Sequence, residues 1–160
     1  MLKTPLHFTA NEDNSSVSLA YWDDLQCIYI DSWSWYEFEY SMTGEDDDWF
    51  DYTIGQVIEL NKDETVYFRA KRGDVDGNPN LNGFAHYDDG VNCIGKLHKF
   101  KMEGSIKANG NIQFLLENTG TKMDVPAYCY YRMFEHCTSL TQAPKLPATT
   151  LADECYSYMF

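Results

Sequence analysis

The most reactive residues that stand side by side in the sequence are His136 and Cys137. A cysteine beside a histidine can act as a catalytic nucleophile, because the histidine takes up the thiol proton. Sequence neighbours on a turn point in different directions, however, so we do not expect this pair to act together. The chain also lacks the Gly-x-Ser-x-Gly, His-Glu-x-x-His and phosphate-loop motifs. We therefore expect no catalytic residue and no enzymatic activity.

Two acidic segments have the residue types that could hold a cation. Asp74–Asn80 places oxygen donors at alternate positions, like the start of a calcium-binding loop. An EF-hand needs glycine and glutamate where this chain has Pro79 and Ala85, so the match fails. Gly44–Asp48, together with Asp51, is interpreted as a solvated acidic turn. We expect neither a bound metal nor a cofactor.

Three tryptophans are the candidates for contact with a ligand: Trp33, Trp35 and Trp49. Flat aromatic faces suit stacking against sugar rings, and β-sandwich modules often use them this way. Trp33 and Trp35 flank one serine at an expected strand boundary, where both indoles can lie on one face. Packing in the core or against another subunit is the competing interpretation, and the sequence leaves both open.

The overall charge and hydropathy exclude several kinds of partner. The formal net charge is −13, whereas binding to nucleic acid needs clustered lysine and arginine. A run of about 18 apolar residues, which a membrane-spanning helix requires, does not occur. Met1–Ala10 lacks the apolar core of a secretion signal, and five cysteines without a CxxC pair indicate buried thiols. These features favour folding in a reducing cytoplasm.

The first 116 residues alternate apolar and polar side chains, as strands with one buried face do. Three hairpins are predicted: Leu6–Ala10 with Val17–Leu19, Ile54–Leu60 with Thr65–Ala70, and Ser105–Ala108 with Asn111–Leu116. Asn109-Gly110, inside the third, is the strongest hairpin signal. Further strands are predicted at Cys27–Ile30, Tyr36–Tyr40 and Leu97–Met102. Residues 1–116 are thus expected to form a mainly β domain, similar to a β-sandwich or jelly roll.

A repeat replaces this alternation in residues 117–160. Cys129–Phe134 returns as Cys155–Phe160 at an offset of 26 residues, and Val125 with Leu151, and Phe114 with Leu140, match at the same offset. A fixed period of this size predicts a solenoid, in which each unit buries its apolar face only by stacking on a neighbour. Because the motif stops at Phe160, we expect this chain to be part of a longer protein. The expected repeat core is Cys129, Met133, Phe134, Cys137, Leu140, Leu146, Leu151, Cys155, Met159 and Phe160.

The segment Met133–Ala152 resembles the BspA-like leucine-rich repeat, with its "MF-x-x-C-T-S-L-T-x-A-P-x-L-P-A-T-T-L-A" phrase. Such repeats are common in surface proteins of gut Bacteroidales and in proteins of their phages. The resemblance implies that Leu140, Leu146 and Leu151 point into the solenoid. It also implies that Cys137 packs inside as a small apolar residue, and that Cys129–Phe134 forms a short helical segment.

The function implied by this resemblance is adhesion or surface recognition without catalysis. The leading interpretation is a virion component of a phage, such as a head or tail fibre or a decoration subunit, located in the virion. Its partners would be other virion proteins, further copies of itself, and a receptor or glycan on the host surface. The alternatives are a BspA-like adhesin on the bacterial cell surface and a glycan-binding β-sandwich module.

Overall fold

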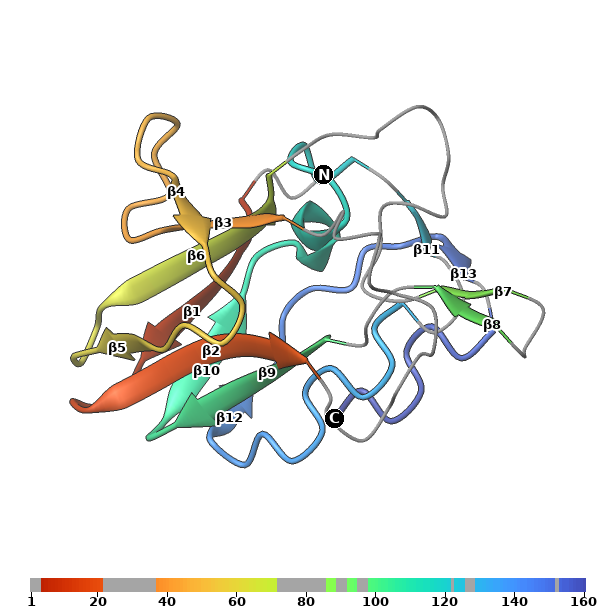
Figure 1. Ribbon diagram of the computed structural model, residues 1–160. Coiled ribbons are helices and arrows are strands. Elements are labelled where there is room, and N and C mark those ends of the chain that lie inside the picture. The colour runs from red at the N-terminus through yellow and green to blue at the C-terminus, as the bar shows by residue number, and fades with distance from the viewer. Residues whose placement is uncertain are drawn as a thin grey trace.

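The computed structural model describes residues 4–21, 37–71, 98–121, 123–125, 129–151 and 153–160, and the backbone of two short strands at 86–88 and 92–94 (Figure 1). The strands of this part are β1 (Leu6–Ala10), β2 (Ser15–Tyr21), β3 (Phe38–Ser41), β4 (Phe50–Tyr52), β5 (Ile58–Leu60), β6 (Thr65–Ala70), β7 (His86–Asp88), β8 (Asn92–Ile94), β9 (His98–Glu103), β10 (Ile106–Asn109), β11 (Asp124–Val125), β12 (Leu140–Gln142) and β13 (Thr150–Leu151). The helical structure in these ranges is a short 3-10 helix, η1 (Ile112–Leu115). The prediction of a mainly β protein is confirmed.

Two sheets form the body of the molecule and face each other across one core. The larger has the order β12-β10-β1-β6-β3-β4, and the smaller has the order β5-β2-β9 (Figure 1). Phe8 on β1 and Phe68 on β6 meet Phe100 on β9, with ring centroids 4.8 and 5.6 Å apart. All three rings are buried. Aromatic rings from both layers therefore close the space between them.

The alternation of residue types explains why these segments are strands. In β1, Leu6, Phe8 and Ala10 are buried while the residues between them are half-exposed. β6 repeats the pattern, with Val66 and Phe68 fully buried. Side chains alternate between the two faces of a strand, so this spacing directs one face to the core. Full burial of each large apolar side chain contributes about 1.5–3 kcal/mol.

The first two predicted hairpins are wrong, although their strands exist. β1 pairs with β10 and β6, whereas β2 pairs with β5 and β9. Likewise β5 belongs to the smaller sheet and β6 to the larger one. Each turn carries the chain from one sheet to the other, so the two strands face each other across the core. Alternation reveals the buried face of a strand but does not distinguish a paired strand from a facing one.

The third predicted hairpin, at Asn109-Gly110, is also wrong. After β10 the chain enters η1 instead of returning as a strand. The side chain of Asn111 caps η1 by accepting a hydrogen bond of 2.9 Å from the backbone N–H of Gln113. Gly110 has a φ of +78°, and a Cβ there would lie 2.1 Å from the carbonyl oxygen of Pro5. The glycine is needed for this close approach, not for a hairpin turn.

A tyrosine hydroxyl also joins the two layers. The hydroxyl of Tyr52, on β4, accepts a hydrogen bond of 2.8 Å from the backbone N–H of Leu19 on β2. It donates to the carbonyl oxygen of Gln56 at 2.6 Å. β5 pairs with β2 only as far as Val17, so the Tyr52 side chain bonds a part of β2 beyond that pairing. Burial raises the pKa of Tyr52 to about 12, partly offset by the hydrogen bond from Leu19.

The C-terminal segments add parallel pairings to this antiparallel body. β12 extends the larger sheet by pairing in parallel with β10, and Ile106 lies opposite Leu140. β11 and β13 pair in parallel, with Val125 opposite Leu151, as the 26-residue offset predicts. Phe114 is not the partner of Leu140, so that matched position is wrong. Buried residues of both regions form one core cluster, which continues across the expected boundary at residue 116.

The helical segment implied for Cys129–Phe134 is not present. These residues form consecutive turns, in which the backbone N–H of Met133 donates to the carbonyl of Tyr130 at 3.2 Å. Arg132 and Tyr158, at equivalent places in the two repeats, have φ values of +56° and +51°. A residue with positive φ cannot continue a right-handed helix, so a helical turn ends at this point. The chain therefore turns with the same geometry in both repeats.

Candidate binding surfaces

The two repeats stack through a regular backbone ladder. The N–H groups of Tyr130, Arg132 and Phe134 donate hydrogen bonds to carbonyl oxygens of the second repeat. The acceptors are those of Cys155 at 2.9 Å, Ser157 at 3.1 Å and Met159 at 2.7 Å, in the same order. Every second residue thus bonds to the residue 25 positions later. This alternation is that of a parallel β ladder, even though the segments are turns.

Aromatic side chains follow the same ladder. The rings of Tyr130 and Tyr156 stack with centroids 5.5 Å apart and planes within 10°. Phe134 and Phe160 stack in the same way, at 5.6 Å and 6°. Phe134 also stacks on Phe100 of β9, at 5.3 Å and 9°. Phe100, Phe134 and Phe160 therefore form one continuous file of rings, which we call the phenylalanine file.

The first repeat is attached to the β layers by a series of side-chain hydrogen bonds to strand backbone. The backbone N–H of Phe100 donates to the carbonyl of Met133 at 2.9 Å. Four side chains of the repeat then bond to carbonyl oxygens on β9 and β10: Cys137 to Phe100, Ser139 to Met102, Thr141 to Ile106 and Gln142 to Ala108, at 2.9–3.3 Å. The segment Cys137–Gln142 thus binds β9, the edge strand of the smaller sheet, and β10 of the larger sheet.

Seven of the ten residues expected in the repeat core are buried or partly buried. Cys129, Met133, Phe134, Cys155 and Met159 are at most 4% exposed. Cys137 and Leu140 are partly buried and pack against the core cluster.

The other three expected core residues are exposed, which corrects the sequence analysis. Leu151 and Phe160 are 58% and 59% exposed because they lie on the outer side of the second repeat. Leu151 and Phe160 cover their equivalents in the first repeat, Val125 and Phe134, which are 3% and 2% exposed. Leu146 is 39% exposed. The nearby Pro144 is the buried residue there.

Two tyrosine hydroxyls lie inside the stack. The hydroxyl of Tyr130 donates to the side-chain oxygen of Gln113 at 3.0 Å, which ties the first repeat to η1. The hydroxyl of Tyr156 is buried and has no hydrogen-bond partner among the described residues. Burial is the main cause that raises the pKa of both tyrosines, with a smaller contribution from the thiols of Cys129 and Cys155. Both phenols are therefore neutral over the physiological pH range.

The geometry at Cys137 is that of a structural cysteine. Its thiol donates to the carbonyl oxygen of Phe100 at 3.1 Å, and burial raises its pKa to about 11. A thiol with this pKa is protonated near neutral pH, whereas a nucleophile must be a thiolate. His136, its neighbour, is exposed and has a φ of +64°. The pair does not form a catalytic arrangement.

The tryptophan candidates are only partly placed by the structure. Trp33 and Trp35 lie outside the described residues, as do the Cys27–Ile30 strand and the Asp74–Asn80 loop. Trp49 is half-buried, and the guanidinium of Arg69 lies 3.9 Å from the centre of its ring. Its indole nitrogen is buried, and no described residue forms a hydrogen bond with it. One face of Trp49 is thus occupied by a cation–π contact and cannot stack on a sugar.

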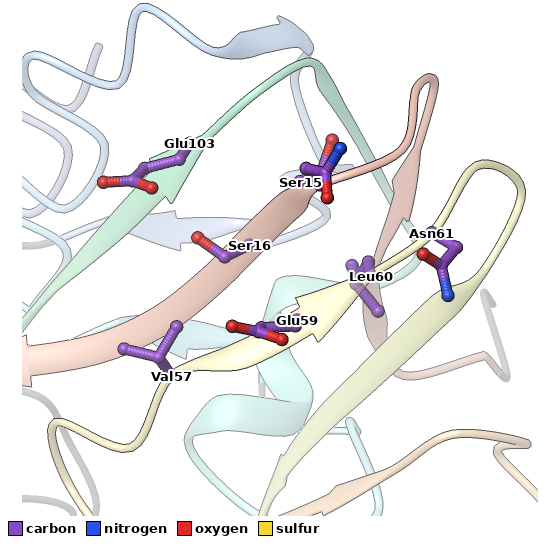
Figure 2. A pocket seen from close by; sticks show the side chains of 8 residues that line it. Ser15, Ser16, Val57, Glu59, Leu60, Asn61 and Glu103 are labelled. Atoms are coloured by element: carbon purple, nitrogen blue, oxygen red, sulfur yellow. The ribbon is translucent and has the colours of Figure 1, made fainter.

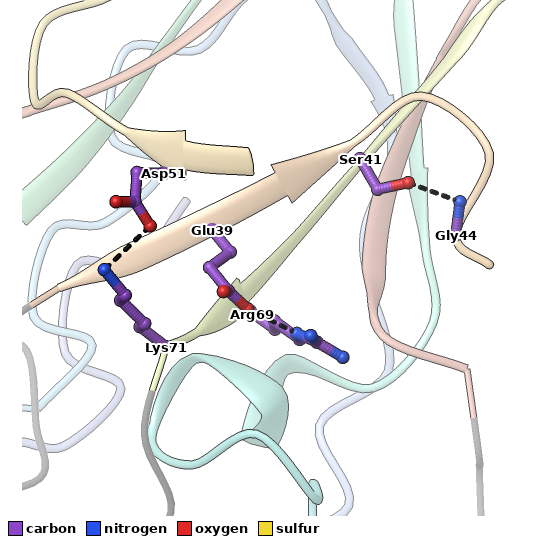
Figure 3. A network of polar contacts seen from close by, with 6 residues as sticks. All are labelled: Glu39, Ser41, Gly44, Asp51, Arg69 and Lys71. Carbon is purple, nitrogen blue, oxygen red and sulfur yellow. Dashed lines mark hydrogen bonds and ion pairs between the residues drawn. The ribbon is translucent and has the colours of Figure 1, made fainter. Parts of the chain in front are cut away.

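The acidic turn is organised by its own hydrogen bonds. The hydroxyl of Ser41 accepts from the backbone N–H of Gly44 at 2.7 Å (Figure 3). The carboxylate of Asp48 accepts from the hydroxyl of Thr43 at 2.6 Å.

Asp51, the other carboxylate considered there, lies 2.8 Å from the ammonium of Lys71 (Figure 3). Within the described ranges, no group of three or more histidine, cysteine, aspartate or glutamate side chains could hold a metal ion.

A groove on the smaller sheet is a site that the sequence analysis missed. Glu59 on β5 and Glu103 on β9 both lie opposite Ser16 of the central strand β2 (Figure 2). The groove has a volume of about 500 Å³ and is lined by Asn14, Ser15, Ser16, Val57, Glu59, Leu60, Asn61 and Glu103. They come from three separate parts of the sequence, 14–16, 57–61 and 103, which the pairing of β5 and β9 with β2 brings together. No local motif could have revealed them.

Comparison with protein-family models, with curated proteins and with solved structures gives no significant match to this chain. Among the described residues, none of the helical structure is long and apolar enough to cross a membrane.

Proposed function

We propose that this protein is a non-enzymatic attachment or display protein. In this proposal the β layers form a sandwich-like base, and the stacked segments begin a leucine-rich-repeat-like solenoid used for recognition. The observation that carries the proposal is the phenylalanine file, which runs from β9 into both repeats without a break. A rigid continuous stack suits display, because repeats with fixed positions present an extended surface to a partner.

The setting that we favour is a phage virion, with the protein as a fibre or decoration subunit made of several copies. The resemblance of Met133–Ala152 to BspA-like repeats supports a role in attachment to gut bacteria. The net charge of −13 and the absence of CxxC pairs agree with assembly in a reducing cytoplasm. A BspA-like adhesin on a bacterial surface is the alternative setting.

Adhesion of the purified chain to gut Bacteroidales cells tests the function. Tyr158, on the second repeat, is 68% exposed, and Phe50, on β4, is 53% exposed. Both aromatic side chains can be replaced by serine with little effect on the core. If the repeats bind the cell surface, Tyr158→Ser lowers the bound fraction several-fold and Phe50→Ser leaves it unchanged. Equal loss in both variants, or no binding by the parent chain, contradicts the proposal.

The setting is tested separately. Native mass spectrometry should detect this protein in purified virions, as a multimer bound to other virion proteins. Detection only in the bacterial envelope would instead support the adhesin.

A glycan-binding module is a second candidate, favoured by the groove beside Ser16. Carboxylate and amide side chains such as Glu59, Glu103 and Asn61 are suitable partners for sugar hydroxyls. Binding to a glycan array that disappears in Glu59→Gln and Glu103→Gln, but persists in Tyr158→Ser, would support this candidate. The opposite result would assign recognition to the repeats.

A further inference from the structure

Two buried cysteines occupy the same position in successive repeats. Cys129 and Cys155 are 1% and 4% exposed, and both are reduced in the structure. The carbonyl of Cys155 accepts the hydrogen bond of 2.9 Å from the N–H of Tyr130, the residue after Cys129. Neighbouring backbones in such a ladder lie about 4.8 Å apart. A disulfide requires Cα atoms about 4.4–6.8 Å apart, so the ladder spacing satisfies this condition.

The surrounding side chains indicate that the two thiols lie next to each other. Two aromatic residues after Cys129 stack on their equivalents after Cys155, since Tyr130 lies on Tyr156 and Phe134 on Phe160. Burial raises the pKa of Tyr130 and of Tyr156, and the thiols of Cys129 and Cys155 add to the rise in both. In-register stacking therefore places the side chain of Cys129 over that of Cys155.

We propose that Cys129 and Cys155 form a site of reversible oxidation, where a disulfide locks the second repeat onto the first. The co-reactant is a small-molecule disulfide such as oxidised glutathione. One cysteine, as its thiolate, attacks one sulfur of the co-reactant and forms a mixed disulfide with it, while the other half of the co-reactant leaves as a thiol. The other cysteine then displaces the second reduced thiol and closes the protein disulfide. Two protein thiols are oxidised, one small disulfide is reduced, and the two protons end on the released thiols.

The cross-link at this site would form slowly, after the protein has folded. Because both thiols are buried, oxidation requires the second repeat to lift from the first, so the reaction is slower than at an exposed thiol. The protein would fold with both cysteines reduced and become cross-linked after transfer to an oxidising medium. This inference concerns the covalent chemistry of the repeats and does not depend on the receptor or on the setting in a virion.

The test uses the intact 160-residue chain in oxidised glutathione, with the fold verified by circular dichroism. Of its five cysteines, two should disappear from the thiol count under denaturing conditions, with a mass loss of two hydrogens. A digest should then contain a peptide pair linked through Cys129 and Cys155. The cross-link closes a loop of about 25 residues, so the melting temperature should rise by roughly 5–10 °C.

Cys137→Ser is the matched control, because Cys137 belongs to the same region but bonds to Phe100 of the base. This variant should still form the cross-link, whereas Cys155→Ser and Cys155→Ala should not. Phe160→Ala should speed the reaction, because it removes the ring that stacks on Phe134. Glutathione adducts without the linked peptide, or a dominant bond between any other two cysteines, would overturn the proposal. A cross-link that lowers the melting temperature would also overturn it.

Discussion

The two regions of this molecule use β pairing in opposite ways. In the β layers, antiparallel strands bring unlike residues together, for example Val17 of β2 beside Ile58 of β5. In the stacked repeats, parallel pairing brings each residue beside its own equivalent, for example Val125 beside Leu151. The first arrangement needs only complementary faces. The second needs a sequence that repeats at one period. The period then predicts which residues pair with each other.

Phe100 is the residue at which the two arrangements meet. Its ring contacts Phe8 and Phe68 of the opposite sheet and also stacks on Phe134 of the first repeat. It is 34 positions before Phe134, so it does not belong to the 26-residue series. The first ring of the phenylalanine file thus comes from β9, a strand of the β layers that is not part of the repeat. Loss of this ring should destabilise both regions, whereas other substitutions should destabilise only one of them.

Phe100→Ala is expected to have the largest effect. Removal of a fully buried phenylalanine ring costs about 3–5 kcal/mol. Because the ring serves both layers and the repeats, the free energy of unfolding should fall by this amount in urea denaturation, measured from either region. Phe50→Ala, at a ring that is 53% exposed, is the control and should change it by less than about 1 kcal/mol. A loss confined to the repeats would mean that Phe100 does not support the β layers.

Gly110→Ala should be the next most damaging change. Gly110 has a φ of +78°, and a new Cβ would lie 2.1 Å from the carbonyl oxygen of Pro5, so we expect a cost of about 2–4 kcal/mol. Gly55 also has a positive φ, of +89°, but its Cβ would meet no described residue within 4 Å. Gly55→Ala should therefore cost only about 1 kcal/mol. Equal midpoints in urea for the two variants would contradict this account of the 109–110 turn.

Tyr52→Phe and Tyr130→Phe form a matched pair, with one residue in each region. The first leaves the N–H of Leu19 without its acceptor, and the second removes a hydrogen bond to Gln113. Each change should lower the free energy of unfolding by about 1–3 kcal/mol. Hydrogen exchange should locate the two losses differently, between the sheets for Tyr52→Phe and between η1 and the first repeat for Tyr130→Phe. The same exchange pattern in both variants would mean that the regions are not distinct.

Alkaline pH should have a smaller effect. The pKa of Tyr52 is raised to about 12 and that of Cys137 to about 11, both by burial. The folded state therefore holds these protons more tightly than the unfolded chain, whose groups titrate near pH 10 and 9. The contribution of these two protonated groups to the free energy of unfolding is fully present below pH 9 and is lost as the pH rises toward 12. Thermal melts across this range should show a shallower decline in Tyr52→Phe than in the parent chain, and identical slopes would contradict the assignment.

The sequence predicts the strands well and their pairing poorly, for a physical reason. Alternation in Leu6–Ala10 and Thr65–Ala70 identifies the buried face correctly, because burial follows from side-chain type. The path of the turn decides whether the next strand pairs with the first in the same sheet or lies in the opposite sheet, across the core. At Asn109-Gly110 the glycine is required by contact with Pro5, a residue more than 100 positions away. A short turn motif contains no information about such a contact.

The repeat is the more predictable region, yet its ends are not. The offset of 26 residues correctly pairs Val125 with Leu151, because a period specifies partners directly. It does not indicate that Leu151 and Phe160 are exposed, since burial of a repeat depends on what stacks on its outer side. The groove at Glu59 and Glu103 has no sequence signal at all, because β2 brings these residues together from different segments.

The most direct test of the continuous stack is native-state hydrogen exchange at the amides of Tyr130, Arg132 and Phe134. These N–H groups donate to the carbonyls of Cys155, Ser157 and Met159. If the second repeat stacks in register on the first, all three amides should be strongly protected in the intact chain, and Phe160→Ala should reduce their protection while β1 remains unaffected. Exchange of these amides at the rate of an unstructured chain, with β1 still protected, would contradict the account.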